Sequence, residues 1–285
     1  MSGYKVFQNG DILDANTDVN PFLMRQTVMV FEDAADRTAQ LDGDELEGMV
    51  TYLKDVAHLQ RYDGSDWVAA AGLVEIVTFT GDADFEKGDY PWLRAVRVRC
   101  QGGGGGGAGA QADPGEQVVA TAGSGGGYSE SFIADLSTVT DPISVTVGAG
   151  GARGAAGQNA GANGGASSFG SLVVANGGSG GGVVGSFSVP ITFIGTPGAA
   201  PGTGDIAAPG QASIGPFGLS GTQGTSGQGG DSVLGAGGGA RVGSGGAGLD
   251  ASGFGAGGGG AKDRDNTARA GGAGAPGIVI VELYA

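Results

Sequence analysis

Six consecutive glycines, Gly102–Gly107, follow directly on the stretch Leu93–Gln101, in which apolar and basic side chains alternate. The alternation predicts a half-buried strand, with its valines and Cys100 on one side and its arginines on the other. The glycines that follow have no side chain to bury, so any structure they form must be held together by the backbone. Glycine stays frequent almost to the end of the chain and accounts for 65 of the 285 residues.

Apolar residues are spread through this glycine-rich region, although glycine at such density is typical of flexible linkers. Short β-branched runs recur between the glycines, so the region has apolar surface to bury. The region also repeats itself, because Gly164–Gly170 (GGASSFG) matches Gly229–Gly235 (GGDSVLG) with an apolar residue kept in place. A repeat that preserves its apolar position predicts an ordered, specified fold.

The backbone conformation open to such glycines is an extended left-handed helix of the polyproline II type. A collagen triple helix is excluded, because the sequence has no strict Gly-X-Y period. Glycine helices can approach closely enough for each N–H to bond a carbonyl of a neighbouring helix, which satisfies the backbone. We therefore predict a mainly β protein whose glycine-rich domain combines β-strands with packed polyglycine II-type helices. Gly102–Gly107 and Gly257–Gly260 are the clearest candidates for such helices.

Charge is unevenly distributed and argues against nucleic-acid partners. The formal net charge is −15, and 18 of the 29 acidic residues lie in the first hundred positions. A phosphate backbone would need a basic face, which this chain lacks. No apolar run approaches the ~20 residues that a membrane-spanning helix needs. Cys100, the single cysteine, cannot form an intrachain disulfide, and a small buried apolar role is expected for it.

Residues 1–72 form the first predicted domain, a small β-rich module for attachment and oligomerisation. The patterns predict strands at 28–31, 48–53, 59–62 and 65–68 and a capped helix at 34–41. Tyr52, Tyr62 and Trp67 are the expected core, since aromatic residues across strands stabilise sheets. A core of this size would give an isolated domain of ~70 residues only marginal stability. We therefore expect the module to associate with copies of itself or with a structure to which it docks.

Residues 73–285 form the second predicted domain, which is glycine-rich. Its strongest β signal is the last stretch, Gly277–Tyr284, which we expect to pair near Leu93–Cys100 and so close the domain. Weaker strand patterns lie between these two. They are at 74–80, 116–122, 128–134, 142–147, 172–175 and 190–194.

None of the motifs indicates a catalytic residue, a bound cofactor or a metal. The six glycines match a dinucleotide-binding pattern trivially, and no helix follows them to receive a phosphate. His58 is the only histidine and lacks the partners of a metal site or a catalytic triad. The acidic residues of 82–89 and the charged residues Lys262, Asp263, Arg264 and Asp265 are interpreted as solvated loops.

Several stretches resemble the minor tail and tail-fibre proteins of actinobacterial phages. The N-terminal module of those proteins is similar to four stretches here: Val28–Phe31, Asp36–Arg37, Glu47–Asp55 and Tyr62–Val68. The glycine-rich domain that follows in many of them is similar to Asp89–Gly105, Val147–Gly151, the two repeated glycine motifs and Ala275–Val281. Residues 183–220 match no pattern of that family and are interpreted as a variable insertion.

The resemblance implies a structural, non-enzymatic protein of the phage tail tip or tail fibre. Such a protein is made in the host cytoplasm without a signal peptide and resides in the virion. Its expected partners are other tail or baseplate proteins, two further copies in a homotrimer, and a host cell-surface glycan or protein. Phe187, Phe193 and Phe217 mark the candidate receptor-contact loops. The alternative is a bacterial surface or carbohydrate-binding module outside any virion.

Overall fold

The structure is a computed structural model that describes residues 28–56, 58–70 and 72–285. The chain divides into two compact units. One ends at Leu73 and also takes in Tyr284–Ala285, and the other spans Val74–Leu283. In the described part of the chain, no helix is both long and apolar enough to cross a membrane.

In its described residues, the N-terminal unit is a four-stranded sheet with one helix. Strands β1 and β2 run parallel, and β2, β3 and β4 follow as antiparallel neighbours. Asp33 caps the helix by accepting a hydrogen bond from the N–H of Asp36 at 2.8 Å, as its position before the first helical turn predicts. The elements are β1 (Val28–Phe31), α2 (Ala34–Leu41), β2 (Val50–Leu53), β3 (His58–Tyr62) and β4 (Trp67–Ala69).

The core of this unit lies between α2 and one face of the sheet. Its buried residues are Phe31, Leu41, Met49 and Leu53. Two of the three aromatic residues expected there, Tyr62 and Trp67, pack against this cluster with their rings 5.3 Å apart. The third, Tyr52, does not belong to it. Tyr52 alternates with buried Thr51 and Leu53, so its half-buried side chain lies on the opposite face of the sheet.

Arg37 joins the helix to the sheet beneath it. Its side chain is buried, and its guanidinium lies 4.1 Å from the centre of the Trp67 ring. Nη1 donates to the hydroxyl of Thr51 at 3.3 Å and to Oε1 of Gln60 at 2.5 Å. The Trp67 ring and the two acceptors of Nη1 stabilise this buried cation, while its buried Nε has no hydrogen-bond partner in the described structure.

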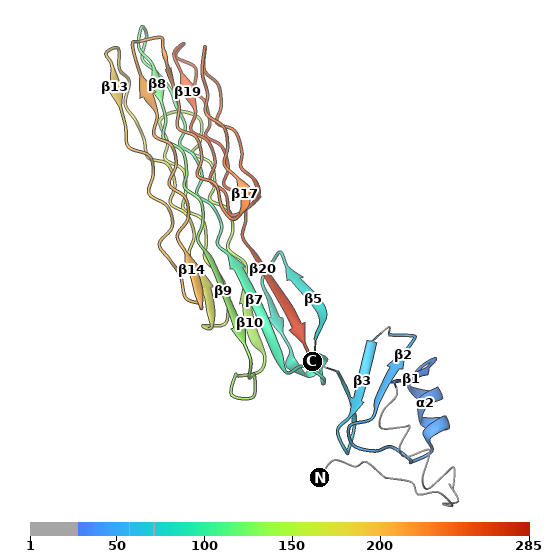
Figure 1. Cartoon of the computed structure of the whole chain (residues 1–285). Helices are drawn as coiled ribbons and strands as arrows, with labels where there is room; N and C mark the ends of the chain where they lie inside the picture. The colour runs from blue at the N-terminus through green and yellow to red at the C-terminus, as the bar shows by residue number, and fades with distance from the viewer. Residues whose placement is uncertain (1–27, 57, 71) are drawn as a thin grey trace, which may run out of the picture. The chain divides into compact units, whose positions relative to one another are not determined.

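The glycine-rich unit is elongated, with strands at both ends and extended chain between them (Figure 1). Strands β5, β7, β9, β10 and β20 gather at one end, and β8, β13 and β19 lie at the other. The chain runs back and forth along the body between these ends. We call the first the sheet end and the second the far end.

Two sheets make the sheet end. The five-stranded sheet has the order β14 (Ile206–Ala208), β9 (Tyr128–Ile133), β7 (Ala95–Gln101), β20 (Ile278–Tyr284) and β5 (Leu73–Phe79). The four-stranded sheet has the order β12 (Val173–Ala175), β11 (Ser167–Phe169), β10 (Ile143–Thr146) and β6 (Ala83–Phe85). The last strand lies beside β7, which confirms the predicted closure of the domain.

Smaller sheets complete the unit. Strands β13 (Ile191–Thr192), β15 (Phe217–Gly218) and β16 (Gly224–Thr225) form a three-stranded antiparallel sheet. Two pairs are β17 (Leu234–Ala236) with β18 (Ser252–Phe254), and β8 (Val118–Val119) with β19 (Lys262–Asp263). A single 3₁₀ turn is described in this unit, η2 (Lys87–Asp89).

Residues 102–110 form the central helix of a packed polyglycine II bundle. Their N–H groups donate to three neighbouring segments in rotation, with N···O distances of 2.8–3.0 Å. Each neighbour is met at every third residue, which is the period of a polyproline II-type helix. The acceptors fall in steps of three, so these neighbours run antiparallel to the central helix. They are Gly127, Ser124 and Thr121, then Gly165, Ala162 and Asn159, then Ala275, Gly272 and Arg269.

Three further segments surround the same helix and donate to its carbonyl groups. Here the donors rise in steps of three along the chain, so these neighbours run parallel to it. They are Gly178 and Gly181, Gly151 and Gly154, and Gly258 and Ala261, again at 2.8–3.0 Å. The central helix thus has six neighbours, and backbone hydrogen bonds to all of them offset the entropic cost of ordering glycine.

Close approach explains why residues 102–107 are all glycine. A Cβ atom built on Gly103 would lie 2.3 Å from the carbonyl oxygen of Ala149, and one built on Gly104 would lie 2.0 Å from that of Ala256. A methyl group is accommodated at Ala108 and Ala110, whereas a Cβ atom built on Gly109 between them would lie 2.2 Å from the carbonyl oxygen of Ala155. These two methyl groups are fully buried in a second hydrophobic cluster at the far end. The predicted polyglycine II-type packing, and with it the fold class, is confirmed.

The sheet end holds the larger hydrophobic core. The side chains of Val96, Val98 and Cys100 are fully buried in it, and Arg99 on the other face of β7 forms an ion pair with Glu282 at 2.6 Å. The predicted alternation along β7 is confirmed. The remaining buried members of this core are Phe85, Leu136, Ile143, Val145, Phe169, Val173, Ala175, Val279, Val281 and Leu283.

The acidic stretch 82–89 is not a wholly solvated loop, contrary to the sequence interpretation. It contains strand β6, which pairs with β10 and buries Phe85 against Phe169 with ring centres 5.5 Å apart. Asp82 accepts a hydrogen bond from the N–H of Val147 at 2.8 Å. Because this stretch is rich in carboxylates, its sequence did not indicate a short strand that is anchored by one aromatic residue.

Cys100 is expected to resist thiol reagents in the folded protein. Burial raises the pKa of its thiol from an ordinary 9.0 to about 12, and the thiolate is the reactive form. Ellman's reagent at about pH 8 should label the denatured chain once and the native chain far more slowly. Because the thiol ionises at a lower pH in the unfolded chain than in the folded one, the free energy of unfolding should fall as pH rises from 9 toward 12. Rapid stoichiometric labelling of native protein would contradict this assignment.

Candidate binding surface at the far end of the glycine-rich unit

The far end has its own hydrophobic core, which supports a small sheet. Ala108 and Ala110 at the end of the central helix, and Ala112 after it, belong to the same hydrophobic cluster as Val118, Val119 and Phe187. The backbone of Phe187 is bridged to that of Gln117 by two hydrogen bonds of 3.0 Å. This bridge fixes Phe187 beneath the sheet formed by β13, β15 and β16.

The three-stranded sheet β13–β15–β16 has an inner and an outer face. On the inner face, a Cβ atom added to Gly218 would collide with the ring of Phe187, which shows that the ring lies directly against the strand. On the outer face, Phe217 of β15 has Thr192 directly opposite on β13 and Thr225 directly opposite on β16. Directly opposed residues of antiparallel strands share a face, so these three side chains form one row. We call this the outer row.

The three phenylalanines proposed for receptor contact occupy three different environments. Phe187 is 7% exposed and belongs to the far-end core, so its ring packs beneath the surface. Phe193 is partly buried against the same core. Phe217 is 41% exposed in the outer row. The exposure of each ring depends on which backbone segments pair, and the spacing of the three phenylalanines in the sequence does not reveal that pairing.

Buried polar side chains hold the turn that joins β15 to β16. The amide Nε2 of Gln117 donates to the carbonyl of Ser220 and, at 2.8 Å, to that of Gln223. The ammonium of Lys262 donates to the carbonyl of Gly224 at 2.6 Å. Burial, reinforced by the charge of Arg264, lowers the pKa of Lys262. Gln117, which directly precedes β8, thus holds the turn, and Lys262 of β19 holds the first residue of β16.

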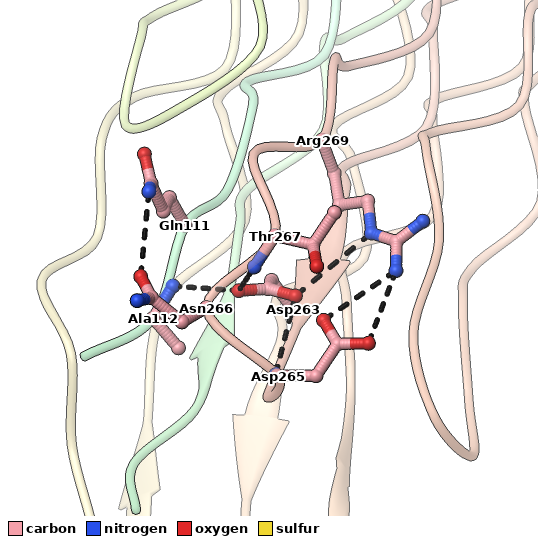
Figure 2. Close-up of polar contacts among 7 residues, drawn as sticks. All are labelled: Gln111, Ala112, Asp263, Asp265, Asn266, Thr267 and Arg269. Carbon is pink, nitrogen blue, oxygen red and sulfur yellow. Dashed lines mark hydrogen bonds and ion pairs between the residues drawn. The ribbon is translucent and has the colours of Figure 1, made fainter. Parts of the chain in front are cut away.

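Asp263, next to Lys262, organises the loop that closes the far end (Figure 2). Its carboxylate is fully buried, and Oδ2 accepts from the N–H of Ala112 at 2.8 Å and of Thr267 at 3.1 Å. Nε of Arg269 lies 3.8 Å from Oδ1, and the same guanidinium bonds Asp265 at 3.3 Å. The contacts link the segment after the central helix to the loop after β19.

Lys262 and Asp263 therefore correct the sequence interpretation, which placed both in a solvated loop. A dense run of charges normally marks a solvated face, and the sequence carries no signal that two of its members are buried. Gln117 was likewise missed, since nothing distinguishes a buried glutamine from an exposed one in a glycine-rich context. Among the described residues, no group of three or more His, Cys, Asp and Glu side chains is placed to hold a metal ion.

The strands around the outer row carry exposed apolar side chains and little charge. Val189 and Ile194 flank β13, and Leu219 follows β15, and all three are exposed. No charged residue occurs in 183–204 or in 206–230. Exposed apolar groups that lie together in a soluble protein mark an interaction site more often than scattered ones do.

A polyglycine II bundle that ends in short sheets and loops defines a class of glycine-rich structural domain. A family model for a glycine-rich domain matches residues 85–284, well over half of the chain. The chain therefore belongs to this glycine-rich domain family. Among curated proteins, none matches the chain significantly.

Proposed function

We propose that the protein is a non-enzymatic structural component of a phage tail tip or tail fibre that contacts the host cell surface through the far end of its glycine-rich unit. The N-terminal module docks the protein to other tail or baseplate proteins. The glycine-rich unit holds its far-end loops away from its own sheet end, where the chain enters it. In this role the protein needs no cofactor, and its partner on the host is a surface glycan or a surface protein.

The observation that carries the proposal is that the glycine-rich unit combines a rigid, hydrogen-bonded bundle with exposed loops at its far end. The central helix is held by backbone hydrogen bonds to six neighbouring segments. Because these bonds keep the bundle rigid, the sequences of the loops at its end are free to vary. The chain enters this unit through β5 at the sheet end, and the exposed outer row lies at the opposite end. A stiff body that presents variable loops at a distance suits an adhesin.

The proposal is tested by locating the protein in purified virions. Mass spectrometry of gradient-purified particles should detect the chain, and a cryo-electron map of the tail should show its glycine-rich unit at the tip or along a fibre. Antibody bound to the far end should block adsorption to host cells. Absence of the chain from purified particles would overturn the proposal and favour the alternative, a bacterial surface or carbohydrate-binding module.

The proposed assembly is a homotrimer formed through the N-terminal module. Val28 and Val30 of β1 and Leu59 of β3 are exposed on the sheet face that α2 does not cover, which gives the module apolar surface to bury. Light scattering should give the mass of three chains. Val30→Asp should shift the population to single chains, because it places a charge in the interface. The matched control Val242→Asp, also at an exposed valine, should leave the mass unchanged.

A further inference from the structure

We infer that the outer row of the β13–β15–β16 sheet is a binding site for an uncharged glycan, with the ring of Phe217 lying against a sugar. This inference deepens the proposed function and rests on it, because it names the chemical class that the far end recognises. It commits to a neutral carbohydrate chain, and a protein receptor becomes one outcome of the test.

The arrangement of the outer row matches the two-sided character of a sugar ring. One face of a hexose presents C–H groups, which pack on the electron-rich face of an aromatic ring. Its rim presents hydroxyl groups, which need donors and acceptors close to that ring. Thr192 and Thr225 lie on either side of Phe217 and each carries a hydroxyl. The Thr225 hydroxyl donates to the carbonyl of Ser226 at 3.3 Å and keeps its oxygen as an acceptor. An apolar platform with a few fixed polar groups is the usual composition of a small-ligand site.

Charge distinguishes a neutral glycan from an acidic one. The protein carries a formal net charge of −15, so its overall field repels anionic polymers. The strands and turns of the site lie within the two uncharged stretches, 183–204 and 206–230. The exposed side chain of Arg264 lies beside them, and its Nη1 donates to the carbonyl of Thr222 in the β15–β16 turn at 3.5 Å. The buried ammonium of Lys262 is engaged from beneath by the carbonyl of Gly224. An uncharged partner is therefore the complementary one.

The site is held rigid before any ligand arrives. Gly218 allows the sheet to lie directly on Phe187, since a Cβ atom there would lie 2.1 Å from the Phe187 ring. A Cβ atom on Gly224 would lie 2.6 Å from the carbonyl oxygen of Phe217 and 3.3 Å from Nε2 of Gln117. Gln117 and Lys262 fix the turn between β15 and β16. Pre-organisation reduces the entropic cost of binding, which matters for glycan contacts that bury little surface.

The test measures binding of the full chain to immobilised neutral polysaccharides, namely a glucan, a mannan, a galactan and an arabinan, with alginate as the acidic comparison. Wild-type protein should bind at least one neutral polysaccharide and not alginate. Binding should change little between about 0.1 M and about 1 M NaCl, because no ion pair contributes. Phe217→Ala should weaken it about tenfold, the loss expected for one aromatic anchor.

The matched control is Phe132→Ala, which removes another exposed ring, 49% exposed, from β9 at the sheet end. It should leave binding unchanged. Equal losses in both variants, or no binding to any of the neutral polysaccharides, would overturn the inference. If host cells are bound through Phe217 but periodate treatment of the cells has no effect, the receptor is a protein and only this inference fails. If Phe217-dependent glycan binding holds but the protein is absent from virions, only the proposed function fails.

Discussion

Replacing Gly105 with alanine is expected to destabilise the glycine-rich unit more than any substitution at its surface. Gly105 lies in the central helix, where its N–H bonds the carbonyl of Ser124 and its carbonyl accepts from Gly258. A Cβ atom there would lie 2.0 Å from the carbonyl oxygen of Ser179. That oxygen is held in the bundle because it accepts a hydrogen bond from the N–H of Ser124. No rotamer change can relieve a clash between a methyl group and a neighbouring backbone.

The expected cost is at least ~3 kcal/mol, the upper range for overpacking a rigid core. For a unit of this size, a loss of ~3 kcal/mol lowers the melting temperature by about 6–12 °C. Differential scanning calorimetry and denaturant unfolding of the full chain measure the effect. If Gly105→Ala fails to fold at all, the loss exceeds the stability of the unit and the prediction still holds.

The control is Gly185→Ala, another glycine of the same unit. No atom lies within 4 Å of a Cβ built on Gly185, and its backbone is not left-handed. This variant should keep the wild-type melting temperature or rise slightly, because alanine reduces the entropy of the unfolded chain. Equal stability of the two variants would show that the central helix is not packed as described.

The strands of the glycine-rich unit could be predicted because their side chains carry a pattern. Alternation identified β7, a weaker strand pattern identified β9, and the apolar run at the C-terminus identified β20. The sequence also indicated where the polyglycine helices begin, because six residues without side chains end the two-residue period of β7. The choice of an ordered bundle over a linker depended on the apolar residues repeated between the glycines.

The neighbours of each polyglycine helix could not be predicted, for a physical reason. Register between strands is normally specified by which side chains are buried, and residues 102–107 have none to specify it. A helix made of glycines can bond any neighbouring segments whose backbone groups have the right spacing. The arrangement of segments in the bundle is therefore set by the sheets and hydrophobic cores at its two ends. The burial of Asp263 depends on that order, because the segment carrying Ala112 and the loop after β19 are brought together only by the completed bundle.

Asp263→Asn is therefore expected to loosen the far end. Both carboxylate oxygens accept from backbone N–H groups, Oδ2 from Ala112 and Thr267 and Oδ1 from Asp265. An amide in either orientation directs an NH₂ donor at one of these donors, and it leaves Arg269 without its buried counter-charge. The expected loss is about 3 kcal/mol in the free energy of unfolding, in the range for breaking a buried charge pair.

Hydrogen exchange by mass spectrometry localises the effect of Asp263→Asn. Exchange should accelerate in 110–112 and 263–269, while β7 and β20 at the sheet end keep their protection, because a separate hydrophobic core holds them. Asp265→Asn is the control, since the Asp265 side chain is half exposed and its charge is replaceable by solvent. If both variants exchange as the wild type does, Asp263 is not the residue that joins the end of the central helix to the last loop. If protection is lost evenly along the whole unit, the two ends unfold together, and the far-end loops cannot vary independently of the bundle that carries them.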